Sequence, residues 1–177
     1  MAIWAAIAVS ASAASFGIWA ARRRFALVTV AGSSMAPTIG DGDRVLVRRA
    51  RLGDVEVGQV VVVERPADGG GWNTEPPRWP GGGRRWLIKR VAALPGDLWP
   101  QEALTGVGPA QAAARLVAFL PPGQFTVLGD NRAASYDSRE MGCIPAARLL
   151  GVVIRPAIPR NPEALAADAP DVVSAGP

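Results

Sequence analysis

Short runs of apolar, β-branched residues, separated by turn-forming residues, are the feature that most limits the fold of this chain. Beyond residue 24 the apolar residues do not follow the spacing of an amphipathic helix. Glycine, proline and aspartate separate the runs, for example at residues 40–43 and 129–131. Short strands between such turns are typical of an all-β domain of antiparallel strands. The expected strands are residues 26–31, 44–48, 57–63, 86–92, 125–128 and 149–154.

The chain divides into three parts. Residues 1–24 are an apolar segment with a basic flank, and residues 25–155 are the β-rich domain. Residues 156–177 are rich in proline and alanine and are expected to be a disordered tail. Within the domain, residues 66–83 form a Pro/Gly-rich loop, and one short helix is expected within residues 102–117.

The amino-terminal segment predicts a transmembrane helix. Residues 2–21 carry no charged side chain and have the length that spans a bilayer. Trp4 and Trp19 lie near the two ends, where interfacial tryptophans are favoured. A cleavable signal peptide is the alternative, with small residues at 11–13. In such a peptide, however, the charge precedes the apolar stretch, whereas here the arginines at 22–24 follow it.

Charge argues against a nucleic-acid partner. The net charge is +4, and the arginines at 22–24 supply three of those charges. The rest of the chain holds sixteen basic and fifteen acidic residues, which is an ordinary solvated surface.

Two absences restrict the chemistry. The chain has no histidine, which excludes Ser-His and Cys-His catalysis and histidine metal sites. Cys143 is the single cysteine, so an intrachain disulfide and a multi-cysteine zinc site are excluded. Cys143 is expected to be a small core residue. We expect no metal and no cofactor, and a nucleophile here needs another base.

A first cluster of interest, residues 32–38, follows the first expected strand. Ser33 and Ser34 lie beside a glycine and before a proline turn, so their backbone is constrained. That suits a nucleophile, whose attack geometry is fixed in advance, and N–H groups at such a turn can form an oxyanion hole. The alternative is that both serines only form the turn.

A second cluster surrounds Lys89, the only lysine among nineteen basic residues. Alternation along a strand puts Lys89 on one face with Leu87 and Val91. Burial there lowers a lysine pKa from about 10.4, and a neutral amine beside a serine hydroxyl is a competent general base. The alternative is a lysine left single by codon bias, whose stem lies on apolar surface while its head reaches water.

A third cluster, residues 127–142, holds two aspartates, one asparagine, two arginines and two serines after a strand. An Asp–Arg pair and serine hydroxyls suit the orientation of a buried amine. The alternative is a solvated surface turn.

Together and in this order, the three clusters resemble those of type I signal peptidases, membrane-anchored serine-lysine proteases that remove leader peptides from exported proteins. Residues 32–38 match the nucleophile box, residues 89–97 the general-base box, and residues 129–139 the third box. The similarity runs from about residue 30 to residue 151. The family fold is an all-β core to which the substrate adds as an extra strand.

The resemblance implies a Ser-Lys dyad. Ser34 attacks the scissile carbonyl and donates its N–H to the oxyanion, and Lys89 is the general base. Ser135 orients the lysine amine through a hydrogen bond, and Asp137 and Arg139 form a supporting ion pair.

The resemblance also implies where the substrate lies. Val30 and Ile88 match positions that line shallow pockets for small side chains, and Gly32 and Met35 complete the expected substrate-binding residues. Some members have a serine at the position of Gly32 as a second oxyanion donor. Larger members insert a second β-domain where this chain has only residues 98–124.

The sequence therefore predicts a single-pass membrane protease with an extracytoplasmic catalytic domain. Its expected partners are membrane lipid and preproteins with small residues before the cleavage site. One alternative is a dedicated propeptide-maturation protease for a single partner on the cytoplasmic side, which residues 22–24 favour under the positive-inside rule. The other is a catalytically inactive membrane binding or assembly protein.

Overall fold

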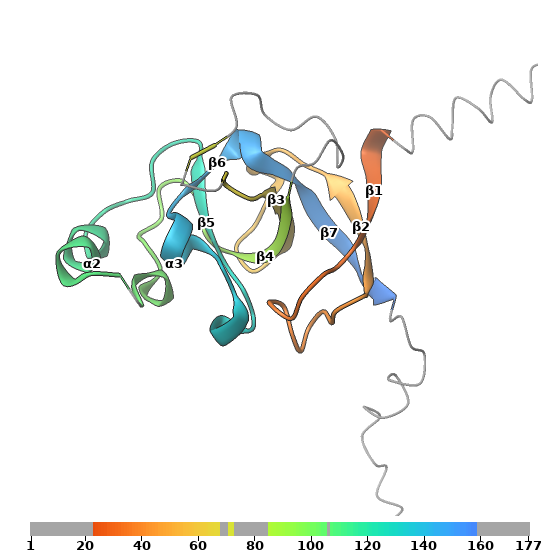
Figure 1. Ribbon diagram of the computed structural model, residues 1–177. Helices are drawn as coiled ribbons and strands as arrows, with labels where there is room; N and C mark the ends of the chain where they lie inside the picture. The colour runs from red at the N-terminus through yellow and green to blue at the C-terminus, as the bar shows by residue number, and fades with distance from the viewer. Residues whose placement is uncertain (1–22, 68–70, 73–84, 106, 159–177) are drawn as a thin grey trace, which may run out of the picture.

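Seven antiparallel strands form one curled sheet in the order β1-β2-β7-β3-β4-β5-β6 (Figure 1). The computed structural model describes residues 23–67, 71–72, 85–105 and 107–158. The all-β prediction is confirmed. The strands are β1 (Phe25–Thr29), β2 (Arg44–Arg49), β3 (Val60–Glu64), β4 (Trp86–Ala93), β5 (Gln124–Leu128), β6 (Ile144–Pro145) and β7 (Leu149–Ile158).

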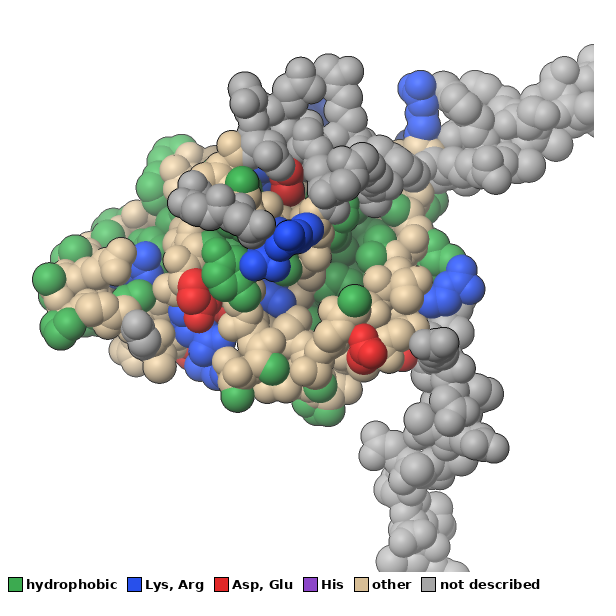
Figure 2. Space-filling view, in the orientation of Figure 1, with side chains coloured by type: hydrophobic (Ala, Val, Ile, Leu, Met, Phe, Trp, Pro, Cys, Tyr) green, Lys and Arg blue, Asp and Glu red, His purple; other side chains and the backbone are tan. Residues whose placement is uncertain are grey.

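The run of valines in β3 is explained by burial on both faces of the sheet. Val61 and Val63 contribute to one apolar cluster, and Val62 contributes to another. All three side chains are fully buried, so a strand in this position needs no polar face. In the space-filling view, apolar side chains line a hollow between β4 and the β1–β2 pair (Figure 2).

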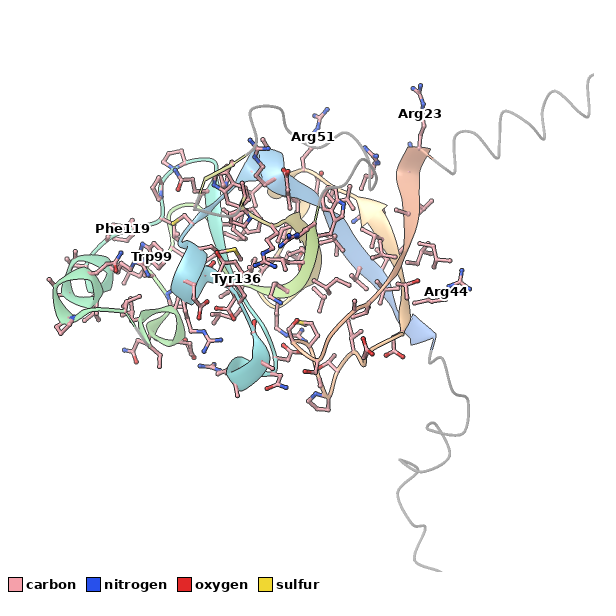
Figure 3. The ribbon with its side chains drawn as sticks, viewed as in Figure 1. Arg23, Arg44, Arg51, Trp99, Phe119 and Tyr136 are labelled. Atoms are coloured by element: carbon pink, nitrogen blue, oxygen red, sulfur yellow. The ribbon has the colours of Figure 1, made fainter. Side chains whose placement is uncertain are left out.

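Helical segments in the described residues are short. The predicted helix within residues 102–117 corresponds to a 3-10 turn, η2 (Gln101–Leu104), and to α2 (Pro109–Leu116). Pro109 opens α2, where its missing N–H costs nothing. Trp99 and Phe119 lie beside α2, at the opposite end of the molecule from Arg44 (Figure 3). The others are α3 (Ser138–Met141), η1 (Leu52–Asp54), η3 (Arg132–Ala134) and η4 (Ala146–Arg148).

Strand β4 changes its hydrogen-bonding partners along its length. Residues Trp86 to Arg90 pair with β3, and β5 pairs with β4 only from Arg90 onward. Among the described residues, the second edge of β4 before Arg90 is therefore unpaired. The outer edge of β1 is also unpaired within that part of the chain, because β1 pairs with β2 alone.

Several predicted segments lie outside the described residues. They include residues 1–22 of the predicted membrane anchor, residues 159–177 of the predicted tail, and most of the loop at 66–83. In the described part of the chain, no helix has the length and apolar character needed to cross a bilayer. Strand β7 continues to Ile158, into the segment predicted to be a tail.

Candidate active site

The side chains of Ser34 and Lys89 meet although 55 residues separate them in the sequence. The distance from Lys89 Nζ to Ser34 Oγ is 2.7 Å, with the amine as donor. Ser34 lies in the loop between β1 and β2, and Lys89 lies in β4 just before the strand acquires its second neighbour. The contact therefore depends on how the sheet curls, which brings the β1–β2 loop against β4.

The loop that carries Ser34, here called the Ser34 loop (residues 30–43), is held at its base and in its middle. Backbone hydrogen bonds join Val30 to Asp43 and Gly42 across the base. Gly32 has a φ of 94°, which favours glycine, and its N–H donates to Asp41 Oδ1 at 2.7 Å. The loop therefore presents Ser34 on a constrained backbone.

Buried side chains fix the same loop to the core. Met35 is 1% exposed and Ile39 is 3% exposed, and both pack in the apolar cluster that contains Ile88. The residue after Ser34 is thus immobilised, and this limits the positions that the hydroxyl can take.

Lys89 is a buried amine with only 2% of its surface exposed. Its cross-strand partner is Val61, and Leu87 and Val91 lie on its own face of β4, as alternation predicts. Burial lowers the pKa of Lys89. The negative charge of Asp137 opposes that shift, and the positive charge of Arg139 adds to it. The amine therefore loses its proton more readily than an exposed lysine does.

Asp137 organises the other side of the site. Its Oδ2 accepts hydrogen bonds from Gly129 N (2.9 Å), Ser135 Oγ (2.7 Å) and Arg139 Nη2 (3.1 Å). Its Oδ1 accepts from Arg139 Nε at 3.0 Å. Burial alone would raise the pKa of Asp137, but the hydrogen bonds from Arg139, Gly129 and Ser135 hold it below its usual range. Asp137 is therefore a fixed negative charge at neutral pH.

Ser135 makes a different hydrogen bond from the one that the resemblance implies. Its hydroxyl donates to Asp137 Oδ2, and no hydrogen bond joins it to Lys89 among the residues that the structure describes. Asp137 and Arg139 form the expected ion pair, at 3.0 Å. The two loops also meet through the backbone, where Asn131 N donates to Ser34 O at 3.0 Å.

Gly129 is a site residue that the sequence analysis did not select. A Cβ at this position would meet Ser135 Oγ and would lie within 2.7 Å of Ser34 O. Only a residue without a side chain lets the two loops approach so closely. A glycine at a strand end gave no indication of this contact, because the contact depends on the tertiary structure.

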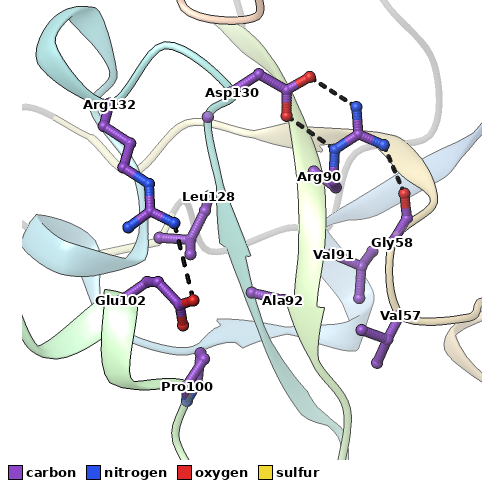
Figure 4. Close-up of a pocket in the computed structure, with 11 residues that line it drawn as sticks. Val57, Gly58, Arg90, Val91, Ala92, Pro100, Glu102, Leu128, Asp130 and Arg132 are labelled. Carbon is purple, nitrogen blue, oxygen red and sulfur yellow. Dashed lines mark hydrogen bonds and ion pairs between the residues drawn. The ribbon is translucent and has the colours of Figure 1, made fainter.

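A second Asp–Arg pair borders the site. Asp130 accepts two hydrogen bonds from Arg90, at 2.8 Å to Nε and 2.6 Å to Nη2, and one from Thr38 Oγ1 at 2.6 Å. Arg90 Nη1 also donates to Gly58 O at 2.7 Å (Figure 4). The Arg90 guanidinium holds the pKa of Asp130 below its usual range. This network ties the Ser34 loop to β4, and the sequence analysis gave it no role.

The predicted substrate-binding residues divide into two groups. Val30, Met35 and Ile88 are buried in one apolar cluster, against which Trp86 packs. Gly32 is exposed and contributes backbone only. The structure therefore places buried apolar side chains next to Ser34.

The remaining candidates carry little chemistry. Cys143 is half-buried, and burial raises the pKa of its thiol, which makes the thiolate scarcer. Among the described residues, no group of three or more Cys, Asp or Glu side chains has the arrangement of a metal site.

Comparisons with known proteins identify a family and two relatives. The family model described as signal peptidase, peptidase S26, matches residues 1–98 and 100–157. The mitochondrial ATP-independent inner membrane protease subunit 1a of Arabidopsis thaliana is 32% identical over 125 residues, which are 69% of this chain and 64% of that protein. The probable signal peptidase I-2 of Synechocystis is 30% identical over 139 residues, which are 69% of this chain and 58% of that protein. The chain thus spans about three fifths of the length of these relatives. By the extent of the family match and the identity to both relatives, the chain belongs to the signal peptidase family, peptidase S26.

Proposed function

We propose that this protein is a serine endopeptidase that removes amino-terminal leader peptides from preproteins, with Ser34 as nucleophile and Lys89 as general base. The observation that carries the proposal is the 2.7 Å contact between the Ser34 hydroxyl and a buried amine. The hydrogen-bond partner of Lys89 is a neutral hydroxyl, and burial lowers the pKa of the amine although the charge of Asp137 opposes that shift. Membership of the family and the names of both relatives support the same activity.

The reaction follows from the protonation states of the two side chains. Neutral Lys89 accepts the Ser34 proton as Oγ attacks the scissile carbonyl, and the ammonium then donates a proton to the departing amine. The resulting acyl-enzyme ester is hydrolysed by water, with Lys89 again as the base. Arginine cannot replace Lys89 in this role because a guanidinium stays protonated in proteins.

The oxyanion is stabilised by the backbone of the Ser34 loop. Ser34 N–H donates to no acceptor among the described residues, and it is therefore available to the developing negative charge. Gly32 N–H already donates to Asp41 Oδ1, and Gly32 has no hydroxyl. We infer that the Ser34 N–H is the principal donor.

The substrate binds as an added strand. The unpaired edges of β1 and of the first half of β4 both border the apolar cluster of Val30 and Ile88. A peptide between these edges gains backbone hydrogen bonds and directs alternate side chains into that cluster. We expect small side chains before the cleavage site to contact that cluster.

We further propose that residues 1–24 anchor the enzyme in a membrane as a single span, with the catalytic domain on the extracytoplasmic side and lipid as a second partner. The arginines at residues 22–24 favour a second candidate, a cytoplasmic maturation protease for one propeptide. A topology reporter fused after residue 177 separates the two, since a cytoplasmic signal contradicts the export assignment. A catalytically inactive assembly protein is the third candidate, and the Ser34–Lys89 contact argues against it.

A pair of serine variants tests the activity. We expect Ser34→Ala to abolish cleavage of a leader peptide, and Ser33→Ala to leave most of it, because Ser33 is exposed and its backbone oxygen makes the turn bond to Ala36 N. Cleavage is measured by mass spectrometry with the full chain in detergent. If Ser34→Ala still cleaves at the wild-type rate, the assignment of the nucleophile is wrong.

A further inference from the structure

A cavity of about 540 Å³ lies next to the candidate active site, beside the second half of β4. Arg90 and Ala92 of β4 line it, and so does Val91 between them. Figure 4 shows the apolar residues around the cavity and the charged residues Arg90, Asp130, Arg132 and Glu102. The other lining residues are Val57, Gly58, Pro100, Leu128 and Gly129.

The cavity and the active site share a wall. Gly129 lines the cavity, and on its other side a Cβ would meet Ser135 and the Ser34 backbone. Asp130 also lines the cavity and accepts a hydrogen bond from Thr38 of the Ser34 loop. A substrate peptide that passes over the Ser34 loop at Thr38 therefore reaches the cavity.

The sheet itself explains why a substrate passes this way, if the proposed function is correct. A peptide on the free edge of β4 pairs only as far as Lys89, because β5 occupies that edge from Arg90 onward. Beyond the scissile bond, the peptide cannot remain in the sheet and must leave it beside Leu128 and Asp130. Both residues line the cavity.

The two guanidinium groups that line the cavity differ in the hydrogen bonds that they make. Arg90 makes two hydrogen bonds to Asp130 and one to Gly58 O. Arg132 approaches Glu102 only to 3.9 Å, beyond hydrogen-bond distance, and these side chains are 55% and 50% exposed. Arg132 is therefore the guanidinium that is available to a ligand, next to apolar surface from Leu128 and Pro100.

We propose that this cavity binds the segment of the substrate that follows the cleaved bond, and that Arg132 selects a carboxylate side chain in that segment. The proposal rests on the proposed protease function and adds a specificity residue to it. A carboxylate that forms the fork-like pair with Arg132 replaces its loose contact with Glu102.

Peptides that differ at a single position test the proposal. One leader peptide is made with Asp, Asn or Lys at each of the first about six residues after the cleaved bond, a length set by the reach of an extended chain. We expect kcat/KM of the wild-type enzyme to favour Asp over Lys by about twofold to fivefold at one or two positions. Arg132→Gln removes that preference, and Glu102→Gln increases it. The control is Arg44→Gln, an exposed arginine at the other end of the molecule, which leaves the preference intact (Figure 3).

A binding measurement tests the role of the cavity independently of cleavage. The Ser34→Ala chain is titrated with the same labelled peptides, and fluorescence anisotropy gives their Kd. The cavity assignment is supported if the Asp peptide binds more tightly and Arg132→Gln removes the difference, whether or not the wild-type enzyme cleaves. It is overturned if charge has no effect at any position or if its effect survives Arg132→Gln. Loss of cleavage alone, with charge-dependent binding intact, counts against the protease function only.

Discussion

Two buried basic side chains in the described part of the chain, Arg148 and Lys89, have different surroundings. Arg148, 8% exposed, forms an ion pair with the buried carboxylate of Glu64, with 2.9 Å between Nη1 and Oε2. Lys89, 2% exposed, donates to the neutral hydroxyl of Ser34. No carboxylate hydrogen-bonds to Lys89 among the residues that the structure describes. Burial removes both side chains from water, but only Arg148 has a carboxylate as its hydrogen-bond partner.

The difference distinguishes a structural cation from a reactive one. An arginine stays charged, so its burial requires a partner of opposite charge. A lysine can avoid the cost of a buried charge by losing its proton. Arg148 thus holds η4 to β3. In the proposed mechanism, Lys89 without its proton has a lone pair that accepts the proton of Ser34.

The largest expected effect comes from giving the lysine position a cation that cannot deprotonate. Lys89→Arg keeps a long basic side chain that stays protonated, and we expect leader-peptide cleavage to fall by about a thousandfold or more because the base is lost. Initial rates with purified variants measure this, and circular dichroism checks the fold. Cleavage at a rate comparable to wild type is incompatible with a Ser-Lys mechanism.

The next largest effect comes from removing Arg148, the ion-pair partner of Glu64. Arg148→Met leaves Glu64 buried without this ion pair, and we expect the free energy of unfolding to fall by about 3 kcal/mol. Urea denaturation monitored by fluorescence gives the value. The double variant Glu64→Met with Arg148→Met is the control and recovers most of the loss. A single variant as stable as wild type shows that the ion pair is not required.

The protonation of Lys89 predicts how activity depends on pH. Protonated Lys89 is inactive, so kcat/KM rises about tenfold per pH unit below its pKa and then becomes constant. Because burial lowers the pKa of Lys89, the plateau begins below the usual value of about 10.4. A pH-rate profile on a substrate without ionisable groups near the cleaved bond measures this. A profile that still rises at and above the usual lysine pKa contradicts the shift.

The smallest effect concerns stability at Lys89. We expect Lys89→Met to raise the free energy of unfolding at neutral pH by about 0.5–2 kcal/mol, opposite in sign to Arg148→Met. Below the lowered pKa of folded Lys89, the wild type buries a charge. Between that pKa and the unfolded value, stability of the wild type rises with pH, and the advantage of methionine shrinks. Denaturation curves at several pH values test this, and a methionine variant that is less stable at every pH contradicts it.

The strand pattern was the most predictable part of the molecule. Five of the expected runs lie at β1, β2, β3, β4 and β5, and the sixth begins β7. These strands were predictable because a short apolar run by itself indicates a buried strand. The burial of Lys89 followed from the same alternation. Strand β6, with two residues, was missed because so short a pairing leaves no pattern.

Contacts between distant residues were not predictable in the same way. The Glu64–Arg148 pair joins residues 84 apart, and the register of β3 against β7 determines it. The need for glycine at residue 129 depends on how closely the Ser34 loop approaches the end of β5. The identity of the residues alone does not predict how closely the two approach.

The change of partner along β4 has a consequence for where a bound peptide is cut. In the proposed binding mode, a peptide forms backbone hydrogen bonds with the free edge of β4 only up to the point where β5 begins to pair with that edge. Because side chains alternate between faces, a slip of one residue points the wrong set into the apolar cluster, whereas a slip of two restores the pattern. In the proposed binding mode, we therefore expect any secondary cleavage to fall an even number of residues from the main one.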